Sequence, residues 1–240
     1  MPSCPYALVP LRSLLSDLLS VFLPRTCAAC GRPLKDWEEC LCLRCIAGLP
    51  LTRFHKDPAN PLAEVFWGRV RIEQAVAWFY FRKGSAYQDV LHNLKYNNRP
   101  GIGIFLGKQI GYELKHSTVF NKPDIIIPVP LHRRKLRKRG YNQSEKIARG
   151  ISVALGIPLD TRTLYRSAQT DTQTRKSRFD RYLNVSGKFA IRDSSLIENS
   201  HILLVDDVVT TGATLEACAE ALLSVTGVRV SVATVAWAKE

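Results

Sequence analysis

Short apolar runs alternate along the chain with longer segments in which apolar residues recur every three or four positions. The apolar or alternating runs predict strands at 71–81, 124–129, 201–205 and 228–237. The three- and four-residue spacing predicts helices at 87–94, 102–114, 142–155 and 214–224. Strands and helices that alternate at these lengths predict an α/β fold with a parallel sheet flanked by helices.

The first 23 residues are expected to form an amphipathic helix, because large apolar side chains recur on one stripe between Leu11 and Phe22. Arg12 and Asp17 interrupt this run, and a membrane span needs about 20 apolar residues. No basic residue precedes the run and no small-residue cleavage site follows it, so we do not expect a signal peptide or a membrane span. The helix docks either on the core or on a partner or membrane surface, and we expect a cytoplasmic protein.

Residues 24–50 are rich in cysteine and poor in periodic apolar positions, and we expect them to form a separate small module. Its pairs Cys27-x-x-Cys30 and Cys42-x-x-Cys45 offer four thiolates that can surround one Zn²⁺. Disulfides are disfavoured in the cytoplasm, which favours a zinc finger. Cys40 is a competing ligand, and the zinc is either purely structural or part of a DNA-contacting surface.

Residues 51–70 are polar and contain prolines, which is typical of a linker, and residues 71–240 are then expected to form the main domain. The chain has 240 residues, of which 46% are hydrophobic and 23% charged, as in a folded soluble protein. Its net charge is +13. Between Asp124 and Arg181 there are 14 Lys and Arg against 5 Asp and Glu, so an anion-binding surface is expected there.

The most informative segment is the apolar run that ends in Asp206-Asp207 and continues into a small polar turn. Ligands of open α/β sheets lie beyond the carboxyl ends of the strands, where these two acids emerge. Two carboxylates can accept hydrogen bonds from a vicinal diol or reach Mg²⁺ through water. The turn offers hydroxyl groups and backbone N–H groups to a phosphate, through Thr210, Thr211, Gly212, Ala213 and Thr214. A Walker-type loop is absent from the sequence, which excludes that class of nucleotide site.

An apolar strand, two acids and a Thr-Gly-x-Thr turn resemble the signature of the type I phosphoribosyltransferases. One branch is similar over nearly the whole chain, namely the ComF family. The residues that carry this resemblance are Asp124-Ile125-Ile126-Ile127-Pro128-Val129-Pro130-Leu131-His132, Arg139-Gly140-Tyr141-Asn142-Gln143-Ser144, Gln173-Thr174, Ser177-Arg178, Arg181, Asn184-Val185-Ser186-Gly187-Lys188-Phe189 and the N-terminal cysteines.

The resemblance implies a type I phosphoribosyltransferase-like fold in a family tied to natural competence and to the handling of single-stranded DNA. It implies that the turn 210–214 holds the 5′-phosphate of 5-phosphoribosyl 1-pyrophosphate and that Asp206 and Asp207 take the ribose hydroxyls, with Mg²⁺ accompanying the ligand. It also implies that residues 169–189 form a flap over the site. The pyrophosphate would face the turn formed by Pro130, Leu131, His132 and Arg133.

Residues 133–139 contain six cations in seven positions, whose mutual repulsion an anion would relieve. Pyrophosphate, a nucleic-acid backbone or both would serve, and a solvated basic loop is the alternative. The flap adds more cations with one tyrosine among them, a mixture that suits single-stranded DNA. The cations expected to contact nucleic acid are Arg134, Lys135, Arg137, Lys138, Arg139, Arg175, Lys176, Arg178 and Arg181.

Three functions are compatible with these patterns. The first is a competence factor that binds phosphoribosyl pyrophosphate with Mg²⁺, engages single-stranded DNA and works with competence or recombination proteins. The second is an active phosphoribosyltransferase for a small nitrogenous acceptor, and the third is a DNA-binding zinc protein with a vestigial pocket. The sequence identifies no general base, so the catalytic residues are unknown.

Overall fold

The computed structural model describes residues 25–96, 99–167 and 188–238, which divide into two compact units, one ending at Gly48 and one beginning at Leu49. The larger unit contains a four-stranded parallel sheet in the order β1-β6-β5-β2. Its strands are β1 (Ala75–Tyr80), β2 (Ile125–Pro128), β5 (His201–Val209) and β6 (Arg229–Trp237). The expected fold class is therefore confirmed.

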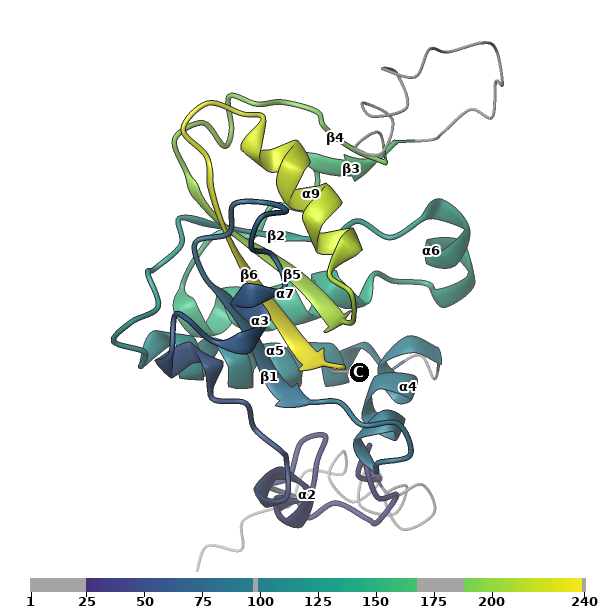
Figure 1. Ribbon diagram of the computed structural model, residues 1–240. Helices are drawn as coiled ribbons and strands as arrows, with labels where there is room; N and C mark the ends of the chain where they lie inside the picture. Colours follow the sequence, from purple (N-terminus) through teal and green to yellow (C-terminus); the bar gives the residue numbers. More distant parts are fainter. Residues whose placement is uncertain (1–24, 97–98, 168–187, 239–240) are drawn as a thin grey trace, which may run out of the picture. The chain divides into compact units, whose positions relative to one another are not determined.

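Helices cover both faces of this sheet, and the side chains of its two central strands are therefore mostly buried. Figure 1 shows α9 (Ala213–Leu223) in front of the strands, with α5 (Pro100–Lys115) and α7 (Gln143–Leu155) behind them. Two short helices lie beyond the carboxyl ends of strands, α4 (Tyr87–Tyr96) after β1 and α6 (Arg133–Arg139) after β2. β3 (Leu164–Arg166) and β4 (Phe189–Ile191) form a separate antiparallel pair.

Close backbone contact joins α5 to α7. A Cβ atom on Gly107 would lie 2.0 Å from the carbonyl oxygen of Ile147, and one on Gly150 would lie 2.2 Å from the carbonyl oxygen of Ile104. Only glycine fits at such a crossing. The two helices therefore pack as one layer, which holds the amino end of α7 against the carboxyl ends of β2 and β5.

Residues 51–70 differ from the expected linker, because they pack on the sheet. They contain η1 (Phe54–Lys56) and α3 (Pro61–Glu64), and they bury Phe54, Leu62 and Phe66. The Asn60 side chain caps α3 and donates to the carbonyl of Ala75 at 2.9 Å. These three apolar residues are irregularly spaced and two prolines lie between the first two, which is why the sequence pattern suggests a linker.

The smaller unit is built around the cysteines. A bridge between Thr26 and Pro33 closes a tight turn in which Gly31 has a φ of 72°. The helix α2 (Leu43–Ala47) begins directly after Cys42 and contains Cys45. The predicted helix within residues 1–23 lies outside the described residues. Among residues 25–96, 99–167 and 188–238, no helix combines the length and apolar character needed to cross a bilayer.

Candidate functional site

The acid pair lies at the carboxyl end of the central strand β5. This strand continues past Val205 to Val209, since its backbone stays in register with β6, where Asp206 pairs with Thr234. On its other side β5 pairs with β2, and Val129 N–H donates to the Val205 carbonyl at 2.8 Å. The structure thus brings the acid pair beside the turn that begins at Pro130, as the sequence predicts.

Asp206 is half-buried between its own strand and the first turn of α7. Its Oδ1 accepts hydrogen bonds from Ser144 Oγ at 2.7 Å and from Asp207 N–H at 2.9 Å. Burial and then the neighbouring Asp207 carboxylate raise the pKa of Asp206 to about 7, despite these two donors. Near neutral pH this carboxyl group can therefore exchange a proton.

Asp207 forms an ion pair that the sequence does not predict. Lys95 Nζ, at the end of α4, lies 2.9 Å from Asp207 Oδ2, and the two side chains are 26% and 15% exposed. Because α4 is far from β5 in the sequence, no local pattern identifies Lys95 as a site residue. The pair places one cation directly on the acids and leaves both groups accessible to solvent.

The turn after β5 lies at the surface. Thr210, Thr211, Ala213 and Thr214 are exposed, and Gly212 has a φ of 77°, the left-handed conformation that glycine tolerates best. No side chain caps the amino end of α9 at this glycine. The N–H groups of the first turn of α9 are therefore not capped by a side chain and can face an anion.

Residues of the packed segment 51–70 support this turn from behind. A Cβ atom on Gly212 would lie 3.1 Å from both Phe66 Cε1 and Val65 Cγ1. Arg69 donates from Nη1 to the Thr211 carbonyl at 2.9 Å and pairs through Nη2 with Glu216 of α9. The segment expected to be a linker thus holds the backbone of the turn in place.

The basic run 133–139 forms the exposed helix α6, in place of a loop. His132 caps it, with Nδ1 accepting from Arg134 N–H at 3.1 Å. The Arg139 guanidinium stacks on Tyr96 of α4, with 5.2 Å between the guanidinium carbon and the ring centroid. The flap residues Arg175, Lys176, Arg178 and Arg181 lie outside the described residues.

Residues 140–144 connect the pieces of the site. Tyr141 donates its hydroxyl to the Leu94 carbonyl at 2.6 Å, next to Lys95. Asn142 caps α7 and donates to the Val129 carbonyl at 2.9 Å. With Ser144 on Asp206, this segment fixes α4, the end of β2 and the acid pair in one arrangement.

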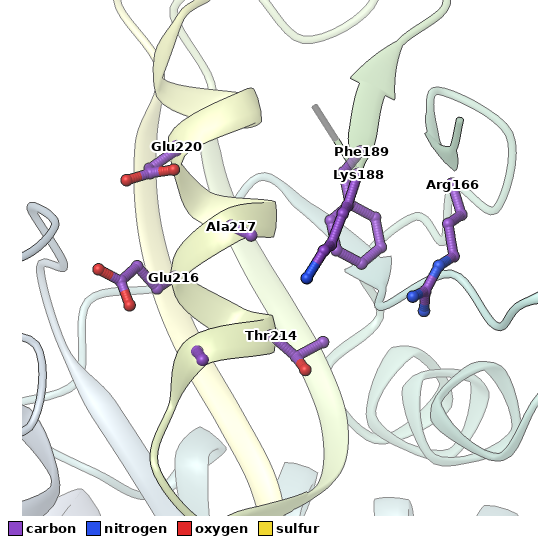
Figure 2. A pocket seen from close by; sticks show the side chains of 8 residues that line it. Arg166, Lys188, Phe189, Thr214, Glu216, Ala217 and Glu220 are labelled. Atoms are coloured by element: carbon purple, nitrogen blue, oxygen red, sulfur yellow. The ribbon is translucent and has the colours of Figure 1, made fainter. Parts of the chain in front are cut away.

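A hollow of about 220 Å³ lies between α9 and the β3–β4 pair. Figure 2 shows Lys188 and Phe189 across from Thr214 and Ala217, with Arg166 beyond them, whereas Glu216 and Glu220 project from the other side of the helix. The cations therefore face the exposed amino end of α9. Glu216 and Glu220 are also among the residues that line the hollow, so its charge is mixed.

Four cysteines of the smaller unit converge. The Sγ atoms of Cys27, Cys30, Cys42 and Cys45 all lie within 4.8 Å of one another, and those of Cys30 and Cys42 are 3.8 Å apart. A tetrahedron with Zn–S bonds of about 2.3 Å has edges of about 3.8 Å, so this donor set fits Zn²⁺. A hydrogen bond from Arg32 N–H lowers the pKa of Cys30 to about 6, which favours the metal-binding thiolate. Cys40 is not a member of the cluster.

Comparison with known proteins identifies the family. Residues 109–240 match the model of the phosphoribosyl transferase domain. The DNA utilization protein YhgH of Salmonella typhimurium is 32% identical over 204 residues, covering 82% of this chain and 83% of that protein. Competence protein ComFC of Bacillus subtilis is 25% identical over 202 residues, covering 83% and 78%. Competence protein F of Haemophilus influenzae is 36% identical over 104 residues, covering 43% and 45%.

The chain belongs to the ComF family. The matched domain includes the acid pair, the turn 210–214 and the turn 130–133 of this ComF-family protein. Lys95, Arg69 and the cysteine cluster precede the matched residues.

Proposed function

We propose that this ComF-family protein binds 5-phosphoribosyl 1-pyrophosphate with Mg²⁺ and engages single-stranded DNA in the cytoplasm during DNA uptake. The observation that carries the proposal is the acid pair at the carboxyl end of β5, directly before a surface turn with Gly212 in the left-handed conformation. The DNA part is supported by the names of three relatives, which are a DNA utilization protein and two competence proteins. The cysteine module that we expect to bind zinc belongs to the same polypeptide.

Each part of the site has a role in this proposal. The backbone of residues 210–214 and the threonine hydroxyls hold the 5′-phosphate, and Asp206 and Asp207 accept hydrogen bonds from the ribose hydroxyls. The turn 130–133 faces the pyrophosphate. Mg²⁺, when bound, would neutralise phosphate charge, with the acid pair as its protein ligands through water.

A second candidate is an active phosphoribosyltransferase, which the family match over residues 109–240 supports. In that reaction the bond between C1′ and the pyrophosphate oxygen breaks, a bond from C1′ to an acceptor nitrogen forms, and the acceptor loses a proton. Charge neutralisation of the leaving group and positioning of the acceptor would provide the catalysis. Release of pyrophosphate in the presence of a nitrogenous acceptor distinguishes this candidate from binding alone.

Calorimetry tests the proposed ligand. Phosphoribosyl pyrophosphate with Mg²⁺ is titrated into the wild-type protein and into Asp206→Ala/Asp207→Ala, and we expect the affinity of the double variant to fall about 100-fold or more. The control is Glu198→Gln, which removes an exposed acid at the opposite end of β5 and should bind as the wild type does. Equal affinity in the double variant, or no binding to the wild type, contradicts the proposal.

A further inference from the structure

A second cavity, of about 460 Å³, lies outside the acid pair and the turn 210–214. We call it the arginine groove. It runs between α6, the first turn of α7 and the β3–β4 pair, and none of the residues 206–214 lines it. Its volume lies within the range of about 300–1,000 Å³ that is usual for small-molecule pockets, which is enough for one nucleotide.

The arginine groove is strongly basic. Arg133 and Arg134 come from α6, Arg166 from β3 and Arg192 from the end of β4, whereas Glu145 is the one carboxylate among its lining residues. Glu145 already has cationic neighbours, since its Oε1 lies 3.6 Å from Arg149 and 3.9 Å from Lys146. The four arginines are exposed. Within the described ranges none of them has a carboxylate partner, so their charge is available to an anion.

Two of these arginines are held by aromatic rings. The Arg192 guanidinium lies 5.4 Å from the ring centroid of Tyr165, and that of Arg166 lies 5.5 Å from the ring centroid of Phe189. Stacking fixes a guanidinium while its N–H groups remain free to bind a phosphate in a bidentate manner. Several neighbouring arginines bind a phosphodiester strand better than they bind a single carboxylate, because phosphates repeat along the strand.

The arginine groove also offers surfaces for a base. Tyr165 is 36% exposed, and Leu131 and Leu136 line the same cavity. A base that stacks on the Tyr165–Arg192 pair must be free of a complementary strand, because the bases of a duplex are covered by their neighbours. The combination of arginines and an exposed ring therefore selects a single strand over a duplex.

We infer that the arginine groove binds a nucleotide segment of single-stranded DNA, with phosphates on Arg133, Arg134 and Arg192 and a base against Tyr165. This inference rests on the proposed engagement of single-stranded DNA and assigns it to a defined surface. The groove shares Arg166 with the hollow beside α9 and shares the turn 130–133 with the ribose-phosphate site. A bound strand thus passes along the edge of that site without occupying the acid pair.

Fluorescence anisotropy with the full-length, zinc-containing protein tests this inference. The probe is a fluorescein-labelled oligothymidine of about 12 nucleotides, within the usual footprint of single-strand binding folds. We expect Arg134→Glu/Arg192→Glu to lower affinity at least about tenfold and to reduce the slope of log K against log salt by about 1.4, or about 0.7 per lost phosphate contact. Tyr165→Leu should lower affinity about tenfold and leave the slope unchanged.

The matched control is Lys122→Glu/Arg229→Glu, which makes the same change in net charge at the opposite end of the sheet, where both side chains are exposed. We expect this control to change affinity less than about threefold, because distant charges act only through the screened overall field. Circular dichroism confirms folding of each variant. Calorimetry with phosphoribosyl pyrophosphate and Mg²⁺ should give wild-type affinity for Tyr165→Leu and for the control variant.

The outcomes separate the inference from the proposed function. If the wild type binds DNA and the groove variants bind like the Lys122→Glu/Arg229→Glu control, the arginine groove is not the DNA surface. If the wild type does not bind the oligonucleotide, the DNA part of the proposed function is wrong and the inference is wrong with it. Equal competition by duplex and single-stranded DNA would contradict the role of Tyr165.

Discussion

The two units of this protein gain their stability in different ways. In the sheet unit, Ile202 to Val205 and most of β6 are fully buried, and the polar residues of the candidate site lie at strand ends, in turns and near helix ends. In the cysteine module the buried side chains are three of the four clustered cysteines, two alanines, Leu41 and Glu38. The module has almost no apolar core.

In the sheet unit, the residues of the candidate site are not the ones that stabilise the fold. In the cysteine module, the metal-binding residues also stabilise the fold. The sheet buries enough apolar surface to fold without a ligand, so its acids and exposed threonines can change while the fold remains. The module depends on the groups that bind the metal, since so small a chain rarely folds alone without such a staple. Substitutions at the two kinds of site should therefore have opposite consequences for stability.

Loss of zinc is the change with the largest expected effect. Structural zinc contributes about 10–16 kcal/mol of apparent folding energy, so Cys42→Ser or chelation should unfold the module. The unfolding transition of the sheet unit should stay where it is. Metal analysis by mass spectrometry and limited trypsin cleavage after Lys35 and Arg44 measure the two effects.

Cys40→Ser is the matched control for this prediction, because Cys40 lies two positions from Cys42 and outside the cluster. We expect Cys40→Ser to keep about one zinc per chain and to resist trypsin as the wild type does. Loss of zinc from both variants would mean that the four-cysteine assignment is wrong. A shift in the melting transition of the sheet unit would mean that the units are not independent.

The sequence predicts the parts of the structure that depend on local pattern. Apolar runs locate β2, β5 and β6 to within a few residues, and the spacing of Cys27, Cys30, Cys42 and Cys45 predicts their cluster. The strand β5 extends further than its apolar run, because backbone pairing with β6 does not require apolar side chains at Asp206 and Asp207. The sequence thus predicts the local chemistry well and the ends of the strands less well.

The contacts that complete the site come from distant segments. Lys95, Arg69 and Ser144 reach the acids or the turn from three separate helices or loops. The helix α6 was not expected, because repulsion among its cations disfavours a helix and only the caps at His132 and Gly140 indicate one. Such pairings follow from the tertiary fold, which a single sequence does not give.

Replacing Asp206 is expected to have the next largest effect. The pKa of Asp206 is raised in the folded state to about 7, so the folded protein binds this proton more tightly than the unfolded chain. The stabilisation is present below about pH 4 and is lost as the pH rises through about 7. The free energy of unfolding should therefore fall over this range, by at most about 4 kcal/mol.

Asp206→Asn should remove this pH dependence and make the sheet unit more stable than the wild type at pH 8, while it weakens ribose-phosphate binding. Urea unfolding at a series of pH values, without divalent cations, measures the first effect. Glu198→Gln, at an exposed position, should keep the wild-type profile. If the stability of Asp206→Asn depends on pH as that of the wild type does, Asp206 is ionised over the whole pH range and its ionisation costs little stability.

The smallest expected effect tests the claim that the sheet unit depends on packing alone. Gly107→Ala places a Cβ atom 2.0 Å from the Ile147 carbonyl oxygen and 3.0 Å from Gly150 Cα, and backbone atoms cannot rotate away. The helices must separate, at a cost of about 1–3 kcal/mol in urea unfolding. Gly101→Ala, in the same helix with no atom within 4 Å, should stabilise by up to about 1 kcal/mol.

Both variants should keep their zinc, because the module gains its stability from sulfur ligands. A Gly107→Ala protein that loses zinc as well as sheet stability would show that the two units fold as one. The two units would then not be stabilised in different ways.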